Sequence, residues 1–256
     1  MDLGIRGKVA LVLGASSGIG EAVAMSLARE GARLAVAARR KDLLEAVAHR
    51  AREAGALDAR PFELDVSDDA SVDRLLGDVG AAYGHAEIAV LNGGGPKAAH
   101  FTDLVTDEWD SAYRLLLRGM LRIAGGVVKP MREHRWGRIV ALTSSSVKTP
   151  IDNLALSNTF RTALVAAMRT LATDVAGDGV TVNSIATGRI ETERLRELYG
   201  NDESRLQKAA SEVPAGRIAS PGEFAPLAVF LCGEPASYVT GQTISVDGGL
   251  TRGLFG

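Results

Sequence analysis

Lys8-Val-Ala-Leu-Val-Leu-Gly-Ala-Ser-Ser-Gly-Ile-Gly20 is the stretch that decides the fold, because a short apolar run passes directly into a glycine-rich turn. Apolar side chains then recur at helical spacing until Gly31. A buried strand, a tight turn and a helix form the first unit of a parallel α/β sheet, and free N–H groups at the start of such a helix attract anions. The stretch therefore predicts both a fold class and a site for a phosphate group.

The rest of the chain repeats this alternation of short apolar strands with helices. Helices are expected at residues 41–53, 70–83, 106–134 and 154–176, the third of them capped by Thr106. Strands are expected at residues 8–13, 33–38, 62–66, 88–91, 138–143, 180–185 and 242–246. Such alternation is typical of a parallel sheet covered by helices on both faces. No linker or repeat interrupts it, so residues 1–256 are predicted to form a single doubly wound α/β domain of the Rossmann type with about seven strands.

The composition excludes several other classes of protein. The chain has 256 residues, 46% of them hydrophobic, and a net charge of −2, which argues against disorder and against binding to nucleic acid or to a membrane surface. The single cysteine, Cys232, excludes a disulfide framework. The four histidines, His49, His85, His100 and His134, are scattered, and no metal site is predicted. No apolar run reaches the ~20 residues of a membrane span, and the N-terminus lacks a signal-peptide pattern, so we expect a cytoplasmic protein.

Glycines follow two of the predicted strands and mark a ligand site. In a doubly wound sheet, ligands bind beyond the carboxyl ends of the strands, at the point where the strand order reverses. Gly14 follows the first strand and Asn92-Gly-Gly-Gly-Pro96 follows the fourth, and these two strands are expected to be neighbours. The glycine spacing differs from the common dinucleotide and P-loop fingerprints, so ordinary turn glycines are the alternative.

Arg39 and Arg40 come directly after the second strand, where an NAD-binding chain usually has an acidic residue for the ribose hydroxyls. An arginine fork instead suits the 2′-phosphate of NADP(H), and Ser16 in the glycine turn can add a hydroxyl donor. NADP(H) is therefore favoured over NAD(H). The alternative for Arg40 is that it only opens a solvated helix.

Several motifs resemble those of the short-chain dehydrogenase/reductase family, and in particular its 3-oxoacyl-[acyl-carrier-protein] reductase-like members. The similarity covers nearly the whole chain and includes Gly14-Ala-Ser-Ser-Gly-Ile-Gly20, Leu64-Asp65-Val66, Asn92-Gly93-Gly94 and a C-terminal signature from Thr240 to Gly249. The resemblance implies a nicotinamide dinucleotide cofactor, with Asp65 at the adenine amino group. The implied cofactor contacts are Gly14, Ser16, Ser17, Gly18, Ile19, Gly20, Arg39, Arg40, Asp65, Val66, Asn92, Gly93, Gly94, Arg161, Thr187, Gly188, Ile190 and Thr192.

The resemblance ends at the catalytic residues. Members of the family have a serine, a tyrosine and a lysine beside the nicotinamide, and an asparagine on the long helix. Here the serine position falls on Ser144, but the tyrosine position, thirteen residues later, is Ser157. The lysine position is Arg161, the asparagine position is Leu116, and no Tyr-x-x-x-Lys motif occurs anywhere in the chain.

The residues at the altered positions still offer some of the chemistry. Ser157 and Arg161 are four residues apart, so both side chains are expected on one face of a helix. Arg161 can hold the nicotinamide ribose, but its pKa, above about 12, prevents proton transfer, and Ser157 can donate a hydrogen bond but is a weak acid. Lys148 is a third candidate: it is the acid or base, an anchor for an anionic substrate, or a side chain in solvent. Tyr113 as a substitute acid and His100 at the pocket mouth are weaker candidates.

The sequence thus supports an NADP(H)-dependent oxidoreductase that acts on a small carbonyl or alcohol substrate, with candidate catalytic residues Ser144, Ser157, Arg161 and Lys148. Residues 188–215 are predicted to form a helical lid whose charges either face solvent or meet the substrate. The alternatives are a dinucleotide-binding sensor or structural protein without hydride transfer, and a lyase or isomerase on the same fold. The resemblance also implies a homodimer or homotetramer, while the identity of the substrate stays open.

Overall fold

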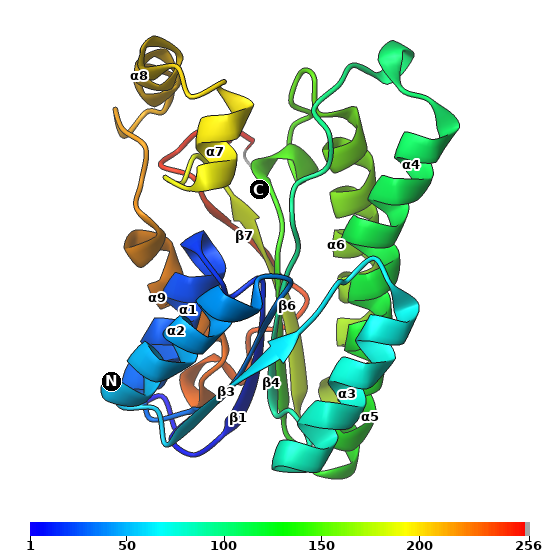
Figure 1. The fold of residues 1–256 in the computed structure, drawn as a ribbon, viewed down its shortest axis with the longest axis vertical. Helices are drawn as coiled ribbons and strands as arrows, with labels where there is room; N and C mark the ends of the chain where they lie inside the picture. Colours follow the sequence, from blue (N-terminus) through cyan, green and yellow to red (C-terminus); the bar gives the residue numbers. More distant parts are fainter. Residues whose placement is uncertain (254–256) are drawn as a thin grey trace.

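The structure is a computed structural model, and residues 1–253 are described. Within this part of the chain, one sheet of seven parallel strands runs through the centre of the molecule in the order β3-β2-β1-β4-β5-β6-β7 (Figure 1). This is the predicted fold class, and β1 and β4 are neighbours as expected. The strands are β1 (Val9–Leu13), β2 (Arg33–Ala38), β3 (Asp58–Glu63), β4 (Ile88–Asn92), β5 (Gly137–Leu142), β6 (Val180–Thr187) and β7 (Thr243–Val246).

Helices cover both faces of the sheet because each central strand is apolar on both sides (Figure 1). In β1, Val12 joins the core beneath α1, α2 and α9, whereas its neighbour Leu11 joins the core beneath α3, α5 and α6. The sheet is therefore the middle of three layers. The helices are α1 (Gly18–Arg29), α2 (Lys41–Glu53), α3 (Asp69–Tyr83), α4 (Thr106–Tyr113), α5 (Gly119–Glu133), α6 (Ala155–Val175), α7 (Glu193–Leu198), α8 (Glu203–Glu212) and α9 (Pro221–Leu231).

The third strand lies earlier in the chain than the predicted 62–66, and that prediction was wrong. β3 pairs with β2 from Asp58 to Glu63. The chain then leaves the sheet, because the Asp65 carboxylate accepts hydrogen bonds from the N–H and the hydroxyl of Ser67 and holds a turn. Pro61 lies inside the strand, which is tolerated because β3 is an edge strand. The charged residues Asp58 and Arg60 interrupt the apolar pattern, so the start of this strand was not recognised.

The predicted continuous helix over 106–134 is interrupted, which corrects the sequence prediction. A π-helical turn, η2 (Arg114–Arg118), separates α4 from α5 and inserts an extra residue into the helical repeat. Thr106 is the first helical residue and not the cap. The Glu108 carboxylate instead accepts a hydrogen bond from the N–H of Val105, which precedes the helix, at 3.1 Å.

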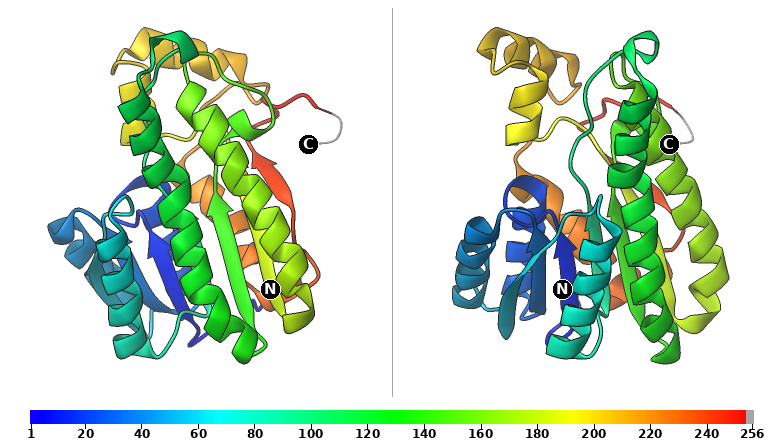
Figure 2. Two further views of the ribbon diagram at one scale, coloured as in Figure 1. Left: turned by 90° about the vertical axis from the view of Figure 1, so that its right-hand side faces the viewer. Right: turned by 45° about the vertical axis from the view of Figure 1, so that its right-hand side comes forward.

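The C-terminal third of the chain contributes α7 and α8 to the region of the site and α9 to the core. α7 and α8 stand beyond the carboxyl ends of the strands (Figure 2). α9 was not predicted, because its apolar side chains lie all round and leave no polar face to mark an amphipathic helix. A capping signal was nevertheless present, since Pro221 opens the helix and the Glu223 carboxylate accepts a hydrogen bond from the N–H of Ser220 at 2.9 Å. The other strands and helices for which bounds were predicted begin and end within two residues of them, and α7 and α8 lie within the predicted lid, residues 188–215.

Over residues 1–253, no helix combines the length and the apolar character needed to cross a membrane. In the same described part, His, Cys, Asp and Glu side chains do not gather in groups of three or more that could hold a metal ion.

Candidate functional site

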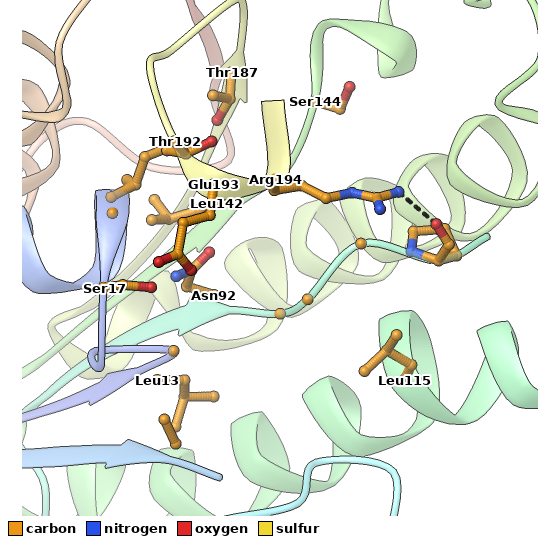
Figure 3. A pocket seen from close by; sticks show the side chains of 18 of the residues that line it. Leu13, Ser17, Asn92, Leu115, Leu142, Ser144, Thr187, Thr192, Glu193 and Arg194 are labelled. Carbon is orange, nitrogen blue, oxygen red and sulfur yellow. Dashed lines mark hydrogen bonds between the residues drawn. The ribbon is translucent and has the colours of Figure 1, made fainter. Parts of the chain in front are cut away.

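A cavity of about 610 Å³ lies at the carboxyl ends of the strands, where the strand order reverses between β1 and β4 (Figure 3). The loops after these strands form one wall, and the segment from β6 into α7 forms the opposite wall. Gly20 and Lys148 are predicted site residues that do not line it. The predicted residues that do line it are Gly14, Ser16, Ser17, Gly18, Ile19, Arg39, Arg40, Asp65, Val66, Asn92, Gly93, Gly94, Ser144, Ser157, Arg161, Thr187, Gly188, Ile190 and Thr192.

The turn after β1 requires glycine at two positions, Gly14 and Gly20. Gly14 has a φ of +60°, and a Cβ on it would lie 2.7 Å from the amide nitrogen of Asn92. A Cβ on Gly20 would lie 2.2 Å from the carbonyl oxygen of Gly14. Gly20 therefore shapes the turn from behind and is not among the residues that line the cavity. The start of α1 is left open toward the cavity, where backbone N–H groups favour a phosphate.

Arg40 lies over the glycine turn, and it is also the residue that precedes α2 as its N-cap, with a side chain 47% exposed. Its guanidinium donates hydrogen bonds to the Ser17 hydroxyl at 2.6 Å and to the Ser16 hydroxyl at 3.3 Å. It also pairs with the Glu193 carboxylate of α7 at 3.3 Å. A guanidinium and two hydroxyls thus meet at one end of the cavity, a donor set that suits a phosphate group.

Asp65 lies on the cavity wall just after β3, next to the arginines. The hydrogen bonds from the hydroxyl and the N–H of Ser67 lower the pKa of Asp65, and the charge of Arg39 lowers it further. The carboxylate is therefore ionised at neutral pH and can accept a hydrogen bond from an amino group. Arg39 itself is exposed and lines the same end of the cavity.

The opposite end of the cavity brings together Ser144, Ser157 and Arg161. Ser144 accepts a hydrogen bond from the N–H of Ser146 at 3.1 Å, so its own proton is free to be donated into the cavity. Ser157 is only 5% exposed, and its hydroxyl makes no hydrogen bond to any residue of the described part of the chain. Arg161 donates to the carbonyl oxygens of Gly94 at 3.1 Å and of Leu142 at 3.3 Å.

The Arg161 guanidinium lies in a less hydrated environment than the sequence suggested. Burial, and secondarily the positive charge of Arg194, lower the pKa of Arg161 to about 10. The side chain still carries its positive charge at neutral pH and acts as a fixed cation, not as a proton relay.

The other candidate acids do not reach the cavity. Lys148 follows the short turn after Ser144 and is not among the lining residues, so the predicted placement in the pocket is not found. Tyr113 is 40% exposed and packs beside Phe160. Leu116 is buried in the π-helical turn, and neither Tyr113, His100 nor Leu116 lines the cavity.

Comparison with known proteins agrees with this geometry. A family model described as enoyl-(acyl carrier protein) reductase matches residues 14–251. The 3-oxoacyl-[acyl-carrier-protein] reductase of Escherichia coli strain K12 is 33% identical over 250 residues, which cover 97% of this chain and 99% of that protein. The chain belongs to the short-chain dehydrogenase/reductase family.

Other members of the short-chain dehydrogenase/reductase family are equally similar along their whole length. The 3-oxoacyl-[acyl-carrier-protein] reductase of Thermotoga maritima is 32% identical, over 96% of this chain and 98% of that protein. The crystal structure of L-sorbose reductase from Gluconobacter frateurii, complexed with NADPH and L-sorbose, is similar with a TM-score of 0.93 and 35% identity. The matched region covers 99% of this chain and 100% of the sorbose reductase chain. These oxidoreductases have different named substrates, so family membership does not fix the substrate.

The short-chain dehydrogenase/reductase site of this chain fits a nicotinamide dinucleotide at the residues that would hold it. A Cβ on Gly14 or Gly20 would collide with Asn92 or with the Gly14 carbonyl oxygen, so only glycine keeps this turn, and the start of α1 faces the cavity. Arg40 and Ser17 supply donors at one end, and Thr192 caps α7 by accepting a hydrogen bond from Leu195 at 3.1 Å on the facing wall.

Among the residues of this short-chain dehydrogenase/reductase site that were not predicted is Arg194. Its guanidinium extends from α7 across the cavity and donates to the carbonyl oxygen of Pro96 at 2.5 Å (Figure 3). Of the two expectations for the charges of the lid, Arg194 lines the cavity and does not only face solvent. The position of Arg194 in the first turn after the cap Thr192, which directs it toward the cavity, was the available signal.

Proposed function

We propose that this protein is an NADP(H)-dependent oxidoreductase that interconverts a small carbonyl compound and its alcohol with an altered catalytic site. One observation carries the proposal: a single cavity joins the Arg40, Ser16 and Ser17 donors at one end to Ser144, Ser157 and Arg161 at the other. The first group suits the 2′-phosphate of NADP(H), and the second suits a carbonyl oxygen that gains negative charge. Residues 188–215, which include α7 and α8, act as the substrate lid of one domain over residues 1–256.

The catalytic end works through hydrogen bonds and a fixed charge. The bound nicotinamide supplies the hydride for carbonyl reduction. Ser144 and Ser157 donate hydrogen bonds to the carbonyl oxygen, and the Arg161 guanidinium stabilises the negative charge that develops there. No lining side chain matches a tuned phenol as a proton donor, so the proton comes from a water molecule held by Ser157. Lys148 is not assigned a role, because it does not line the cavity.

The test measures binding and turnover separately. NADPH and NADH are titrated into the protein by isothermal titration calorimetry, and NADPH oxidation is followed by absorbance with a panel of small ketones, aldehydes and oxo acids. We expect NADPH to bind at least about tenfold more tightly than NADH, and at least one carbonyl compound to be reduced. Equal affinity for the two cofactors contradicts the NADP(H) preference.

A second candidate function rests on the altered catalytic positions. Ser157, Arg161 and Leu116 replace the tyrosine, lysine and asparagine that the family resemblance predicts, which favours a dinucleotide-binding protein without hydride transfer. Tight NADPH binding with no oxidation of NADPH across the whole panel would support this second candidate. A failure to bind either dinucleotide overturns both.

We also infer self-association in the cytoplasm through the face formed by α4 and α6. Apolar side chains are exposed there, with Phe101 71%, Val105 62% and Tyr113 40% exposed. Trp109 and Phe160 pack between them with ring centroids 5.9 Å apart. Light scattering after size-exclusion chromatography tests this: a homodimer or homotetramer is expected, and a monomer at micromolar concentration contradicts it.

A further inference from the structure

Two arginines from different elements meet on one wall of the cavity. Arg161 of α6 binds the carbonyl oxygen of Gly94, and Arg194 of α7 binds the carbonyl oxygen of Pro96. Between these two carbonyls, a Cβ on Gly95 would lie 2.1 Å from the Arg194 side chain, so the guanidinium rests directly on the backbone. Both cations are thus held against the same three-residue segment that follows β4.

The positive charge of this pair is poorly compensated by the protein. Within residues 1–253, Arg161 forms no ion pair with a carboxylate. Arg194 has one ion pair, to Glu197 at 3.6 Å, and the Glu197 side chain is 63% exposed. Exposed pairs of this length contribute little, because water screens them. The other acidic residues on the cavity wall are engaged elsewhere, since Asp65 is bonded to Ser67 and Glu193 to Arg40.

A serine hydroxyl is available at the same place. Ser157 is 5% exposed, lines this end of the cavity and forms no side-chain hydrogen bond within residues 1–253, and its oxygen is open to the cavity and is not one of the fully buried atoms without a partner. A ligand oxygen in the cavity can therefore accept a hydrogen bond from it. Two guanidinium groups and the hydroxyls of Ser144 and Ser157 thus form a set of donors that suits an oxygen-rich acceptor.

This donor set lies apart from the donors that suit the cofactor phosphates. Figure 3 shows Arg194 extending away from Ser17 and toward the segment after β4, on the side of Leu115 and Ser144. The phosphate donors, Arg40 and the glycine turn, lie at the other end of the cavity.

We propose that Arg161 and Arg194 form a carboxylate-binding subsite for the substrate. The substrate is then a small oxo acid, whose carboxylate lies between the two guanidinium groups and whose carbonyl oxygen faces Ser144 and Ser157. The match rests on geometry, because a guanidinium binds both oxygens of a carboxylate at once. The inference deepens the proposed function and depends on it for the reaction itself, in which the carbonyl carbon gains a hydride from NADPH and the oxygen gains a proton from water.

The binding test uses oxalate, which presents carboxylates but is not reduced. Oxalate and inorganic phosphate are titrated separately, by calorimetry, into the protein saturated with NADPH. The test variant is Arg194→Gln, and the matched control is Arg205→Gln on α8, an exposed arginine that pairs with Asp202 at 3.6 Å and does not line the cavity. We expect Arg194→Gln to weaken oxalate binding by about tenfold or more, since hydrogen bonds to charged groups are strong. Arg205→Gln leaves it unchanged, and Arg194→Lys gives an intermediate affinity.

The kinetic test compares 2-oxobutanoate with butanone, which differ by the carboxylate. We expect kcat/KM to be at least about tenfold higher for 2-oxobutanoate in the wild-type protein, and this preference to disappear in Arg194→Gln. NADPH affinity should stay within about twofold in that variant. A loss of NADPH affinity, with oxalate binding retained, would assign Arg194 to the cofactor and overturn the proposal.

Other outcomes are also decisive. Tighter binding of phosphate than of oxalate replaces the oxo acid with a phosphorylated substrate. Absence of oxalate binding to a protein that binds NADPH overturns the subsite and leaves the proposed function standing. If NADPH itself does not bind, the proposed function fails, and oxalate titration of the protein alone still decides whether the arginine pair binds a carboxylate. Thermal unfolding of each variant confirms that it is folded.

Discussion

The guanidinium of Arg161 donates a hydrogen bond to the carbonyl oxygen of Gly94, 3.1 Å away, and so joins α6 to the segment that follows β4. The same group donates to Leu142 at the end of β5. One side chain therefore holds together the ends of two neighbouring strands that frame the cavity. A residue at the family's lysine position thus has a structural role here in addition to its charge.

Restoring the tyrosine and lysine of the family pattern should raise turnover. In the double variant Ser157→Tyr, Arg161→Lys, a phenol with a lysine four residues later becomes available as a proton donor. Positioned acid–base groups contribute about 10²–10⁴-fold, so we expect an increase of that order in kcat for any carbonyl compound that the wild-type protein reduces. The matched control, Ser157→Phe with Arg161→Lys, has the ring without the hydroxyl and should show no gain. Equal rates in the two double variants would exclude the phenol as the cause.

Gly20→Ala should weaken cofactor binding and stability together. The new Cβ would lie 2.2 Å from the carbonyl oxygen of Gly14, so the turn must shift. Overpacking of this kind costs about 1–3 kcal/mol, and we expect a lower unfolding midpoint in urea and NADPH affinity reduced by about tenfold or more. Gly77→Ala is the control, because a Cβ there meets nothing within 4 Å inside α3. It should be neutral or stabilise by up to about 1 kcal/mol. An unchanged Gly20→Ala protein would show that the turn is not rigid.

Arg40→Gln should reduce the preference for NADPH. The substitution removes the cation that bonds to Ser16 and Ser17 and suits the 2′-phosphate. A hydrogen bond to a charged group contributes about 1.5–3 kcal/mol, so NADPH affinity should fall by about 10- to 100-fold while NADH affinity stays the same. The control is Arg74→Gln on α3, an exposed arginine that does not line the cavity. Parallel losses for both dinucleotides would mean that Arg40 only stabilises the turn.

The Glu223 carboxylate should contribute to stability in a pH-dependent way. Hydrogen bonds from Arg217 and from the backbone N–H of Ser220 lower the pKa of Glu223 from 4.5 to about 2. Since the folded pKa is depressed, the stabilisation is present above about pH 4.5 and is lost as the pH falls toward 2.

Glu223→Gln tests this by thermal unfolding between pH 3 and pH 7. The wild-type protein should unfold at a higher temperature than the variant at pH 7, and the difference should shrink as the pH falls below about 4.5. The control is Glu30→Gln, an exposed residue without an ion pair in residues 1–253. A difference that does not depend on pH would exclude ionisation of Glu223 as its source.

The sequence predicted the parallel sheet well because its central strands are continuous apolar runs, which identify buried strands without reference to neighbours. β3 was misplaced because an edge strand can carry Asp58, Arg60 and Pro61, and only pairing with β2 reveals it. The π-helical turn at 114–118 was not predicted, since the spacing stays helical on each side of it and the extra residue shifts only the phase of the pattern.

For the site, the positions fixed by the backbone were predictable and the positions fixed by long side chains were not. Gly14 and Asn92 follow strands whose ends must meet, so their proximity follows from topology. Arg40 and Arg194 can each point to solvent or to the cavity, and only the packing of the lid decides which. Lys148 is the converse case, because its loop reaches the site while its side chain does not line the cavity.

The two edge strands of the sheet, β3 and β7, differ in whether a further strand can pair with them. At one end, β3 contains a proline without an N–H to donate, together with three charged residues, and both features oppose pairing with another chain. At the other end, β7 is Thr-Ile-Ser-Val, with neither proline nor charge. The sheet is therefore protected against edge-to-edge aggregation on one side, and any extension of it by a second molecule is directed to the other.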